Sequence, residues 1–341
     1  MTPISSEQLS FIGQGLSRPE CALAHQSGIV LVPDWTGVGG VSVIFPDGTV
    51  KRHLAKNWSA LAQPLGLEDA VRPNGICLLD GGDILMAHLG AERGGVYRLA
   101  PDGSLSVFLS EVEGEILPPS NFVTVDEQGW VWITVSTRKT PRAAAYRSDV
   151  ADGFIVLVKD GEARIVADGL GYTNECLVHP DGRRLFVNET FARRLTSFDI
   201  GEDGSLSNRS TIAELGHGIY PDGLAFDEYG AAWLTSIVSN RVLRVSADGS
   251  VDIYLEDVDQ DHLEWVEQAW RDHDMGRQHL DKAAGKVLRN VSNLAFCGEN
   301  LNQAVLGCLL GDRLATFPMP VKGHQPVHWT FDIQPLLQAL K

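Results

Sequence analysis

Residues 220–255 read YPDGLAFDEYGAAWLTSIVSNRVLRVSADGSVDIYL, a succession of short apolar runs separated by turns that contain glycine. The runs are rich in Val, Ile, Leu, Thr and aromatic residues, which suit strands with one buried face. The turn ADG at 247–249 places glycine where a hairpin needs a positive φ angle. This stretch therefore predicts consecutive antiparallel strands.

Units of the same kind recur along the chain of 341 residues. Examples are GIVLVPDW at 28–35, GGVYRLAPDGSLSVFL at 94–109 and GFIVLVKDGEARIVA at 153–167. A carboxylate or amide side chain precedes each group of runs, at Glu20, Asn74, Asn121, Asn174, Asp222 and Asn293. Most of these positions lie roughly 50 residues apart, as blades of four strands require. We predict an all-β fold, a six-bladed β-propeller forming a single domain over residues 1–341.

The interval between Asp222 and Asn293 is longer than the others. Residues 259–286, DQDHLEWVEQAWRDHDMGRQHLDKAAGK, lack a strand pattern and are rich in helix formers. They predict a helical insertion between blades five and six. The insertion is either a surface decoration or a lid beside the channel mouth, because long insertions in compact folds are often functional.

The innermost strand of each propeller blade lines the central channel, so the six repeated polar residues are expected to form a ring. Glu20, Asn121, Asn174 and Asp222 offer the oxygen ligands that hard cations prefer, and we predict that they bind one divalent cation. Calcium is the first expectation, then magnesium or manganese, with zinc less favoured in a set without His or Cys. The alternative is that these residues only cap turns.

The amino-acid composition disfavours several classes of binding partner. With 28 basic and 44 acidic residues, the chain has a formal net charge of −16, which disfavours nucleic acid and anionic membrane surfaces as partners. The five cysteines include no CxxC pair, which argues against a disulfide framework. No basic and apolar leader begins the sequence, and we expect a cytoplasmic protein. The oligomeric state stays open.

Three segments carry a family resemblance: SNFVTVDEQGWVWIT at 120–134, TNECLVHPDGRRLFVNET at 173–190 and YPDGLAFDEYGAAWLTS at 220–236. In this order the chain resembles the SMP-30/gluconolactonase/LRE-like family, related to diisopropyl-fluorophosphatase and more distantly to paraoxonase. The resemblance extends from Arg18 to about Pro320. It implies metal ligands at Glu20, Asn174 and Asp222, and a contact of Asn121 with metal or substrate. It also implies that Asp222 acts as base or nucleophile in a calcium-requiring lactonase or esterase.

Several residues depart from the family pattern. Glu175 follows Asn174 where the family usually has glycine, and Phe122 stands where an aspartate is usual. Pro119 stands where sugar-lactone members often have arginine, so we expect a less polar substrate. The predicted substrate-binding residues share a place in the ring, beside it or in the basic loop at 137–153: Asn74, Asn121, Phe122, Arg138, Glu175 and Asn293.

These observations predict a metal-dependent hydrolase that opens a small lactone or related ester. The cation would polarise the carbonyl, while Asp222 activates water or attacks directly. The sequence contains no GxSxG, GxxxxGK[ST] or HExxH motif that would indicate another mechanism. A phosphotriester or fluorophosphate hydrolase on the same site is one alternative. A non-catalytic ligand-binding propeller with a structural ion is the other, and a strictosidine-synthase-like condensing enzyme is disfavoured.

Overall fold

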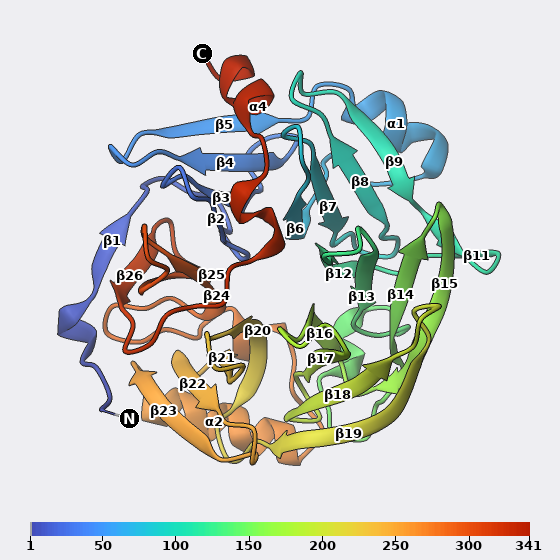
Figure 1. The fold of residues 1–341 in the computed structure, drawn as a ribbon. Coiled ribbons are helices and arrows are strands. Elements are labelled where there is room, and N and C mark those ends of the chain that lie inside the picture. The colour runs from blue at the N-terminus through green and yellow to red at the C-terminus, as the bar shows by residue number, and fades with distance from the viewer. Residues whose placement is uncertain (1) are drawn as a thin grey trace.

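Six four-stranded antiparallel sheets surround a central channel in the computed structural model, which describes residues 2–341 (Figure 1). The prediction of a six-bladed β-propeller is confirmed. In five blades the strands follow one another in chain order from the channel outward. Many neighbouring strands in a blade are joined by tight glycine-containing turns, as predicted, whereas a long loop with η2 connects β13 to β14.

The blades are made of consecutive strands. Blade one contains β2 (Leu23–Ala24), β3 (Val30–Asp34), β4 (Gly40–Ile44) and β5 (Val50–Leu54). Blade two contains β6 (Pro73–Leu78), β7 (Ile84–His88), β8 (Val96–Leu99) and β9 (Leu105–Leu109). Blade three contains β12 (Ser120–Val125), β13 (Val131–Val135), β14 (Gly153–Lys159) and β15 (Glu162–Leu170). Blade four contains β16 (Thr173–Val178), β17 (Arg184–Glu189), β18 (Arg194–Ile200) and β19 (Leu206–Glu214).

Blade five contains β20 (Tyr220–Phe226), β21 (Ala232–Ile237), β22 (Arg241–Val245) and β23 (Val251–Glu256). Blade six combines both ends of the chain: β24 (Val291–Cys297), β25 (Gln303–Cys308), β26 (Leu314–Pro318) and β1 (Ser10–Ile12). A small ribbon pairs β10 (Glu111–Val112) with β11 (Glu115–Ile116). The helical segments are η1 (Ser6–Gln8), α1 (Trp58–Leu65), η2 (Arg142–Ala145), α2 (Gln260–Arg271), α3 (Arg277–Leu280), η3 (Val327–Thr330) and α4 (Gln334–Ala339).

A repeated Asp–Trp contact shapes the hairpin between the two innermost strands. In blade three, Asp126 accepts hydrogen bonds from the backbone N–H of Trp130 and from the Trp132 indole, both at 2.9 Å. In blade five, Asp227 accepts the indole hydrogen bond of Trp233 at 3.0 Å. The repeated D…G…W pattern of the sequence is therefore a turn closed by a buried carboxylate.

The hydrophobic core lies between neighbouring blades. Trp132 of blade three packs with Leu185 and Val187 of blade four. Trp233 of blade five packs with Phe296 of blade six in the same way. Burying each such side chain contributes roughly 1.5–3 kcal/mol, so contact between blades is the main stabilising element of the ring.

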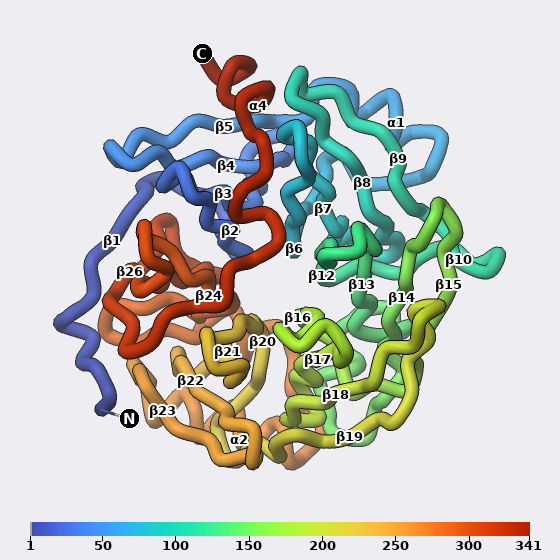
Figure 2. The backbone as a smooth tube through the Cα atoms, viewed as in Figure 1, coloured from blue at the N-terminus to red at the C-terminus, as the bar shows by residue number. Residues whose placement is uncertain are grey.

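The two ends of the chain close the structure differently. β1 pairs with β26 and becomes the outermost strand of blade six, so the N-terminal segment closes the ring of blades. The C-terminal segment crosses the channel on the face turned to the viewer and ends in α4 beside blade one (Figures 1 and 2). Leu336 of α4 is buried in the core of blades one and two.

The helices α2 and α3 lie between β23 and β24. Asp259 caps α2 by accepting a hydrogen bond from the backbone N–H of His262, and Leu263 and Val266 are buried against Tyr220 and Ile237. The insertion is thereby fixed onto blade five. Within residues 2–341, every helix falls short of the length and hydropathy needed to cross a bilayer.

Candidate active site

Irregular pairing of the innermost strands produces the site. Strands β6, β12, β16 and β20 each shift register against their partner at the repeated polar residue, which is Asn74, Asn121, Asn174 or Asp222. A β-bulge takes a residue out of the regular alternation and redirects its side chain. These four residues therefore turn toward the channel axis at the same level.

Five of the six predicted ring residues line one pocket, which we call the ring pocket: Glu20, Asn74, Asn121, Asn174 and Asp222. In blade six the register shift falls at Ser292, whose hydroxyl donates to the Glu20 carbonyl at 2.7 Å. Asn293 lies one position further along and lines a different cavity. The structure thus separates Asn293 from the other five residues.

The amide groups of the ring are oriented by hydrogen bonds. Asn74 donates from Nδ2 to Glu20 Oε1 and to Asn121 Oδ1, both at 2.9 Å. The Nδ2 of Asn121 donates to Ser136 Oγ at 2.7 Å, and the Nδ2 of Asn174 donates to Thr190 Oγ1 at 2.9 Å. Because each amide nitrogen has a protein acceptor, the oxygen Oδ1 of Asn174 remains for another partner.

Three buried oxygens of the ring have no hydrogen-bond donor among the described residues: Glu20 Oε2, Asn74 Oδ1 and Asn174 Oδ1. A buried polar atom without a partner costs about 1–3 kcal/mol. Carboxylate and amide oxygens are the donors that calcium and magnesium prefer, so this set fits a hard divalent cation. Over residues 2–341, no group of three His, Cys, Asp or Glu side chains is placed to hold a metal ion. The ring contains only two carboxylates, and its other oxygen ligands are amides.

Both ring carboxylates are almost completely buried, Glu20 with 3% and Asp222 with 4% of its surface exposed. Burial raises the pKa of Glu20 to about 7, against the opposing influence of Arg18 and the hydrogen bond from Asn74. Burial and then the charge of Glu20 raise the pKa of Asp222 well above its usual range. Two adjacent buried carboxyl groups therefore require either protons or a cation.

Segments inserted into the blades form the roof of the ring pocket. The pocket is also lined by Arg142 of η2, by Tyr146 just after it, and by Arg277 and Leu280 of α3. The space that these side chains enclose is small, about 40 Å³. The inserted helices α2 and α3 are therefore part of the site's surroundings.

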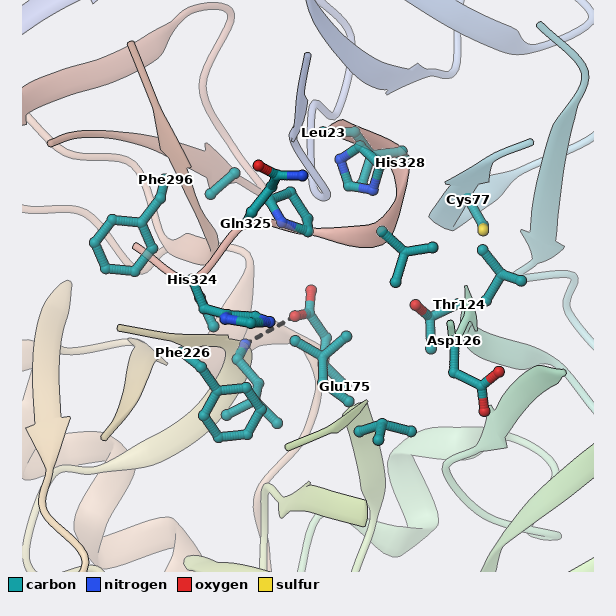
Figure 3. A pocket seen from close by; sticks show the side chains of 18 of the residues that line it. Leu23, Cys77, Thr124, Asp126, Glu175, Phe226, Phe296, His324, Gln325 and His328 are labelled. Atoms are coloured by element: carbon teal, nitrogen blue, oxygen red, sulfur yellow. Dashed lines mark hydrogen bonds between the residues drawn. The ribbon is translucent and has the colours of Figure 1, made fainter. Parts of the chain in front are cut away.

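The second cavity lies at the other end of the channel. The first residues of the innermost strands line the ring pocket, and later residues of the same strands line the second cavity. It encloses about 160 Å³ and is lined in part by residues 324–328 of the C-terminal segment. Figure 3 shows Glu175 in this cavity together with His324 and His328. Glu175 accepts hydrogen bonds from Asn293 Nδ2 and from the backbone N–H of Leu224, both at 2.8 Å.

Two of the three residues that depart from the family pattern, Phe122 and Glu175, line this second cavity. In blade five, Gly223 follows the ring residue, and a Cβ there would come within 2.5 Å of the Asn293 Cα. Blades three and four carry Phe122 and Glu175 at the corresponding place, and both side chains line the second cavity. We expected Phe122 to make the substrate site less polar. Its side chain lines the second cavity and not the ring pocket.

Arg138 lies apart from both cavities. Its guanidinium forms two hydrogen bonds of 2.8 Å with the carboxylate of Asp168 and stacks on the Phe154 ring at 4.2 Å. The pocket arginines that sequence reasoning missed are Arg18, Arg142 and Arg277. Arg18 precedes Glu20 by two residues and Arg142 belongs to the basic loop, whereas no motif distinguished Arg277.

Fold and site together define a six-bladed β-propeller with an oxygen-lined pocket in its channel. A model of the SMP-30/gluconolactonase/LRE-like region matches residues 67–256, more than half of the chain. The chain belongs to the SMP-30/gluconolactonase/LRE-like family, as the sequence resemblance predicted.

Individual relatives agree with this placement. A 6-deoxy-6-sulfogluconolactonase of Pseudomonas putida is 31% identical over 166 residues, which are 47% of this chain and 54% of the relative. The chain thus spans about half the length of this curated relative. The solved structure of a gluconolactonase from Xanthomonas campestris has a TM-score of 0.63 at 20% identity, covering 90% of this chain and 88% of its own. Regucalcin from Agrobacterium tumefaciens, a calcium-binding protein, has a TM-score of 0.66 at 15% identity, covering 96% and 99%.

Proposed function

We propose that this protein hydrolyses a small lactone in the ring pocket, with a divalent cation held by Glu20, Asn121, Asn174 and Asp222. The observation that carries the proposal is the group of buried, unpaired oxygens beside the Asp222 carboxylate. The names of the relatives support a lactone as the substrate class, and the calcium-binding relative supports calcium as the ion.

The chain supplies the remaining chemistry. A divalent cation bound here would polarise the lactone carbonyl as a Lewis acid. Asp222 accepts a proton from a water molecule that attacks the carbonyl carbon, and the bond between that carbon and the ring oxygen then breaks. The departing ring oxygen takes up a proton, and the product is a hydroxy acid. Direct attack by the Asp222 carboxylate is the alternative route to the same product.

Two tyrosine rings form part of the wall of the ring pocket. Tyr146 and Tyr172 pack edge to face with ring centroids 5.4 Å apart, and both line the ring pocket. Their rings reduce the access of bulk water to the carboxylates below. Interactions of charged groups in the pocket are therefore stronger than they would be in open solvent.

The first prediction concerns Asp222→Asn. This change keeps the shape of the side chain but removes its basicity, so lactone turnover should fall by about 100-fold or more. Hydrolysis would be followed with a pH indicator on a panel of lactones, with added calcium and with a chelator, and circular dichroism would verify folding.

The exposed carboxylate of Asp199 on β18 provides the matched control, and Asp199→Asn should retain wild-type turnover. Wild-type activity in a folded Asp222→Asn protein would remove Asp222 from the mechanism. Full activity of the wild-type protein in chelator would remove the cation from it.

A further inference from the structure

Three arginines line the ring pocket, and each comes from a different part of the chain. Arg18 precedes β2, Arg142 belongs to η2 and Arg277 begins α3. The only acidic side chains lining this pocket, within residues 2–341, are those of Glu20 and Asp222. Because Asp281 neutralises Arg277, the charges of the lining side chains balance, and a bound divalent cation would create a surplus of two positive charges. This local surplus contrasts with the net charge of −16 of the whole chain.

Within residues 2–341, Arg18 forms no salt bridge, and other contacts hold its side chain. Its backbone adopts the left-handed conformation at φ 52°, and its guanidinium stacks on the Trp35 ring at 4.5 Å. The Nε atom is buried and has no hydrogen-bond acceptor among the described residues. A strained backbone and a buried, unpaired guanidinium donor at the pocket wall indicate a role in ligand binding.

Among the described residues, Arg142 also has no partner, although the other two arginines of the same loop are paired. Arg138 binds Asp168 and Arg147 binds Asp149, whereas the Arg142 side chain makes no hydrogen bond or ion pair within residues 2–341. Arg277 does pair, with Asp281 at 2.5 Å. The loop therefore presents one free guanidinium, and that guanidinium lines the ring pocket.

The pKa of Tyr146 is affected by the positive charges of these arginines. Burial acts to raise the pKa of its hydroxyl, but the charges of Arg142 and Arg277 outweigh burial and lower that pKa. Tyr146 also lines the pocket, so its phenol and the guanidinium groups form one donor-rich wall. Such a wall, in the same pocket as Asp222, is suited to an oxyanion.

We propose that the lactone substrate carries an anionic substituent, such as a sulfonate, carboxylate or phosphate, and that Arg18 and Arg142 bind it with support from Arg277. The planar guanidinium group matches the geometry of these anions and can donate two parallel hydrogen bonds. This inference rests on the proposed function, because the lactone carbonyl must lie beside Asp222 while the anion contacts the roof.

The kinetic test compares two lactones that differ in one group. One is a neutral sugar lactone, and the other has a sulfonate in place of its terminal hydroxyl, since the charge of a sulfonate does not change across the assay pH range. The wild-type protein should prefer the sulfonated lactone in kcat/KM. Arg142→Ala should raise KM for that lactone by about 10- to 100-fold and impair the neutral lactone by a clearly smaller factor.

Arg147→Ala is the matched control, because Arg147 lies in the same loop but pairs with Asp149 outside the pocket. It should leave both lactones unaffected. If the arginines instead hold the carboxylate released by ring opening, Arg142→Ala will impair both lactones equally, which overturns the proposal. Equal preference of the wild-type protein for the two lactones overturns it as well.

A binding measurement separates this inference from the proposed activity. Inorganic sulfate would be titrated into the protein by calorimetry in the presence of a chelator. Wild type and Arg147→Ala should bind it, and Arg142→Ala should bind it at least tenfold more weakly. Sulfate binding of this pattern without turnover of any lactone would refute lactone hydrolysis and retain the anion site. Equal sulfate binding by all three proteins would refute the anion site.

Discussion

The pKa values of Glu20 and Asp222 depend on burial and on the charged and polar groups around them. Arg18 and a hydrogen bond from Asn74 lower the pKa of Glu20 only in part, because burial is the larger influence and raises it. Asp222 is affected by burial and by the negative charge of Glu20. In the ionised state these two residues repel each other, and a divalent cation between them would remove the repulsion.

This balance predicts a pH-dependent effect of calcium on stability. The pKa of Glu20 is about 7 in the cation-free fold and 4.5 in its ordinary state. The folded chain therefore holds this proton more tightly than the unfolded chain, so cation-free stability falls as pH rises from about 4.5 to 7. The shift corresponds to roughly 3 kcal/mol. Calcium restores this loss, so it should raise the melting temperature much more at pH 8 than at pH 5.

Thermal unfolding with calcium and with chelator at both pH values measures this difference. Glu20→Gln is the informative variant, because the amide does not titrate in this range. It should weaken the pH dependence of the chelated protein, with the contribution of Asp222 remaining. An equal effect of calcium at pH 5 and pH 8 in the wild-type protein would contradict the assignment of Glu20 as a cation ligand.

At the scale of secondary-structure elements, α2 is anchored by a buried ion pair. Glu267 of α2 binds Arg193, which lies between β17 and β18, and also accepts hydrogen bonds from Tyr220 and the backbone of Gly218, both at 2.9 Å. The Arg193 guanidinium stacks on the ring of Trp270 at 3.6 Å. These contacts hold the inserted helices above the ring pocket.

Glu267→Gln should release this anchor. It leaves the charge of Arg193 buried without its counter-ion, which typically costs about 3–5 kcal/mol. Hydrogen exchange should show faster exchange of the α2 amides by at least about 100-fold, while the blade strands stay protected. Arg271→Ala is the control, since Arg271 is half exposed and 3.9 Å from Glu267, and it should change little. Unchanged exchange in Glu267→Gln would mean that apolar packing alone holds α2.

The strands were predictable from the sequence, whereas the bulges that complete the site were not. Turns such as 247–249 and the Asp126–Trp132 pattern are local, so the sequence contains their signal. A bulge arises from the pairing of two strands and has no comparable local signal. For this reason the spacing placed Asn293 in the ring, although the register shift of blade six falls at Ser292.

The pocket arginines illustrate the same limit for tertiary contacts. Arg142 and Arg277 are separated by more than a hundred residues and meet only because the blade-three loop and the α2–α3 insertion converge above the channel. The sequence identified the basic loop, but Arg138 was the residue singled out. Which arginine enters the pocket depends on the fold of the loop, in which Asp168 binds Arg138 on the outside.

At the scale of the whole molecule, the propeller depends on closure of its ring. β1 pairs with β26 through Ser10↔Thr316, Phe11↔Ala315 and Ile12↔Leu314. The guanidinium of Arg313 lies 4.0 Å from the centre of the Phe11 ring. Ile4 and Leu9 pack on the core of blades five and six. Without this strand, β26 becomes an exposed edge with unpaired backbone groups.

Removal of residues 2–12 should therefore destabilise the whole ring. Loss of several half-buried apolar side chains corresponds to about 3 kcal/mol, or a melting temperature lower by roughly 5–10 °C. The exposed edge of β26 should also cause self-association, measurable by size-exclusion chromatography with light scattering. Phe11→Ala is the matched control, because it removes packing but keeps the strand, so it should lower stability without causing association. If the shortened protein kept both its melting temperature and its original size, β1 would be dispensable, and contacts between blades alone would hold the ring closed.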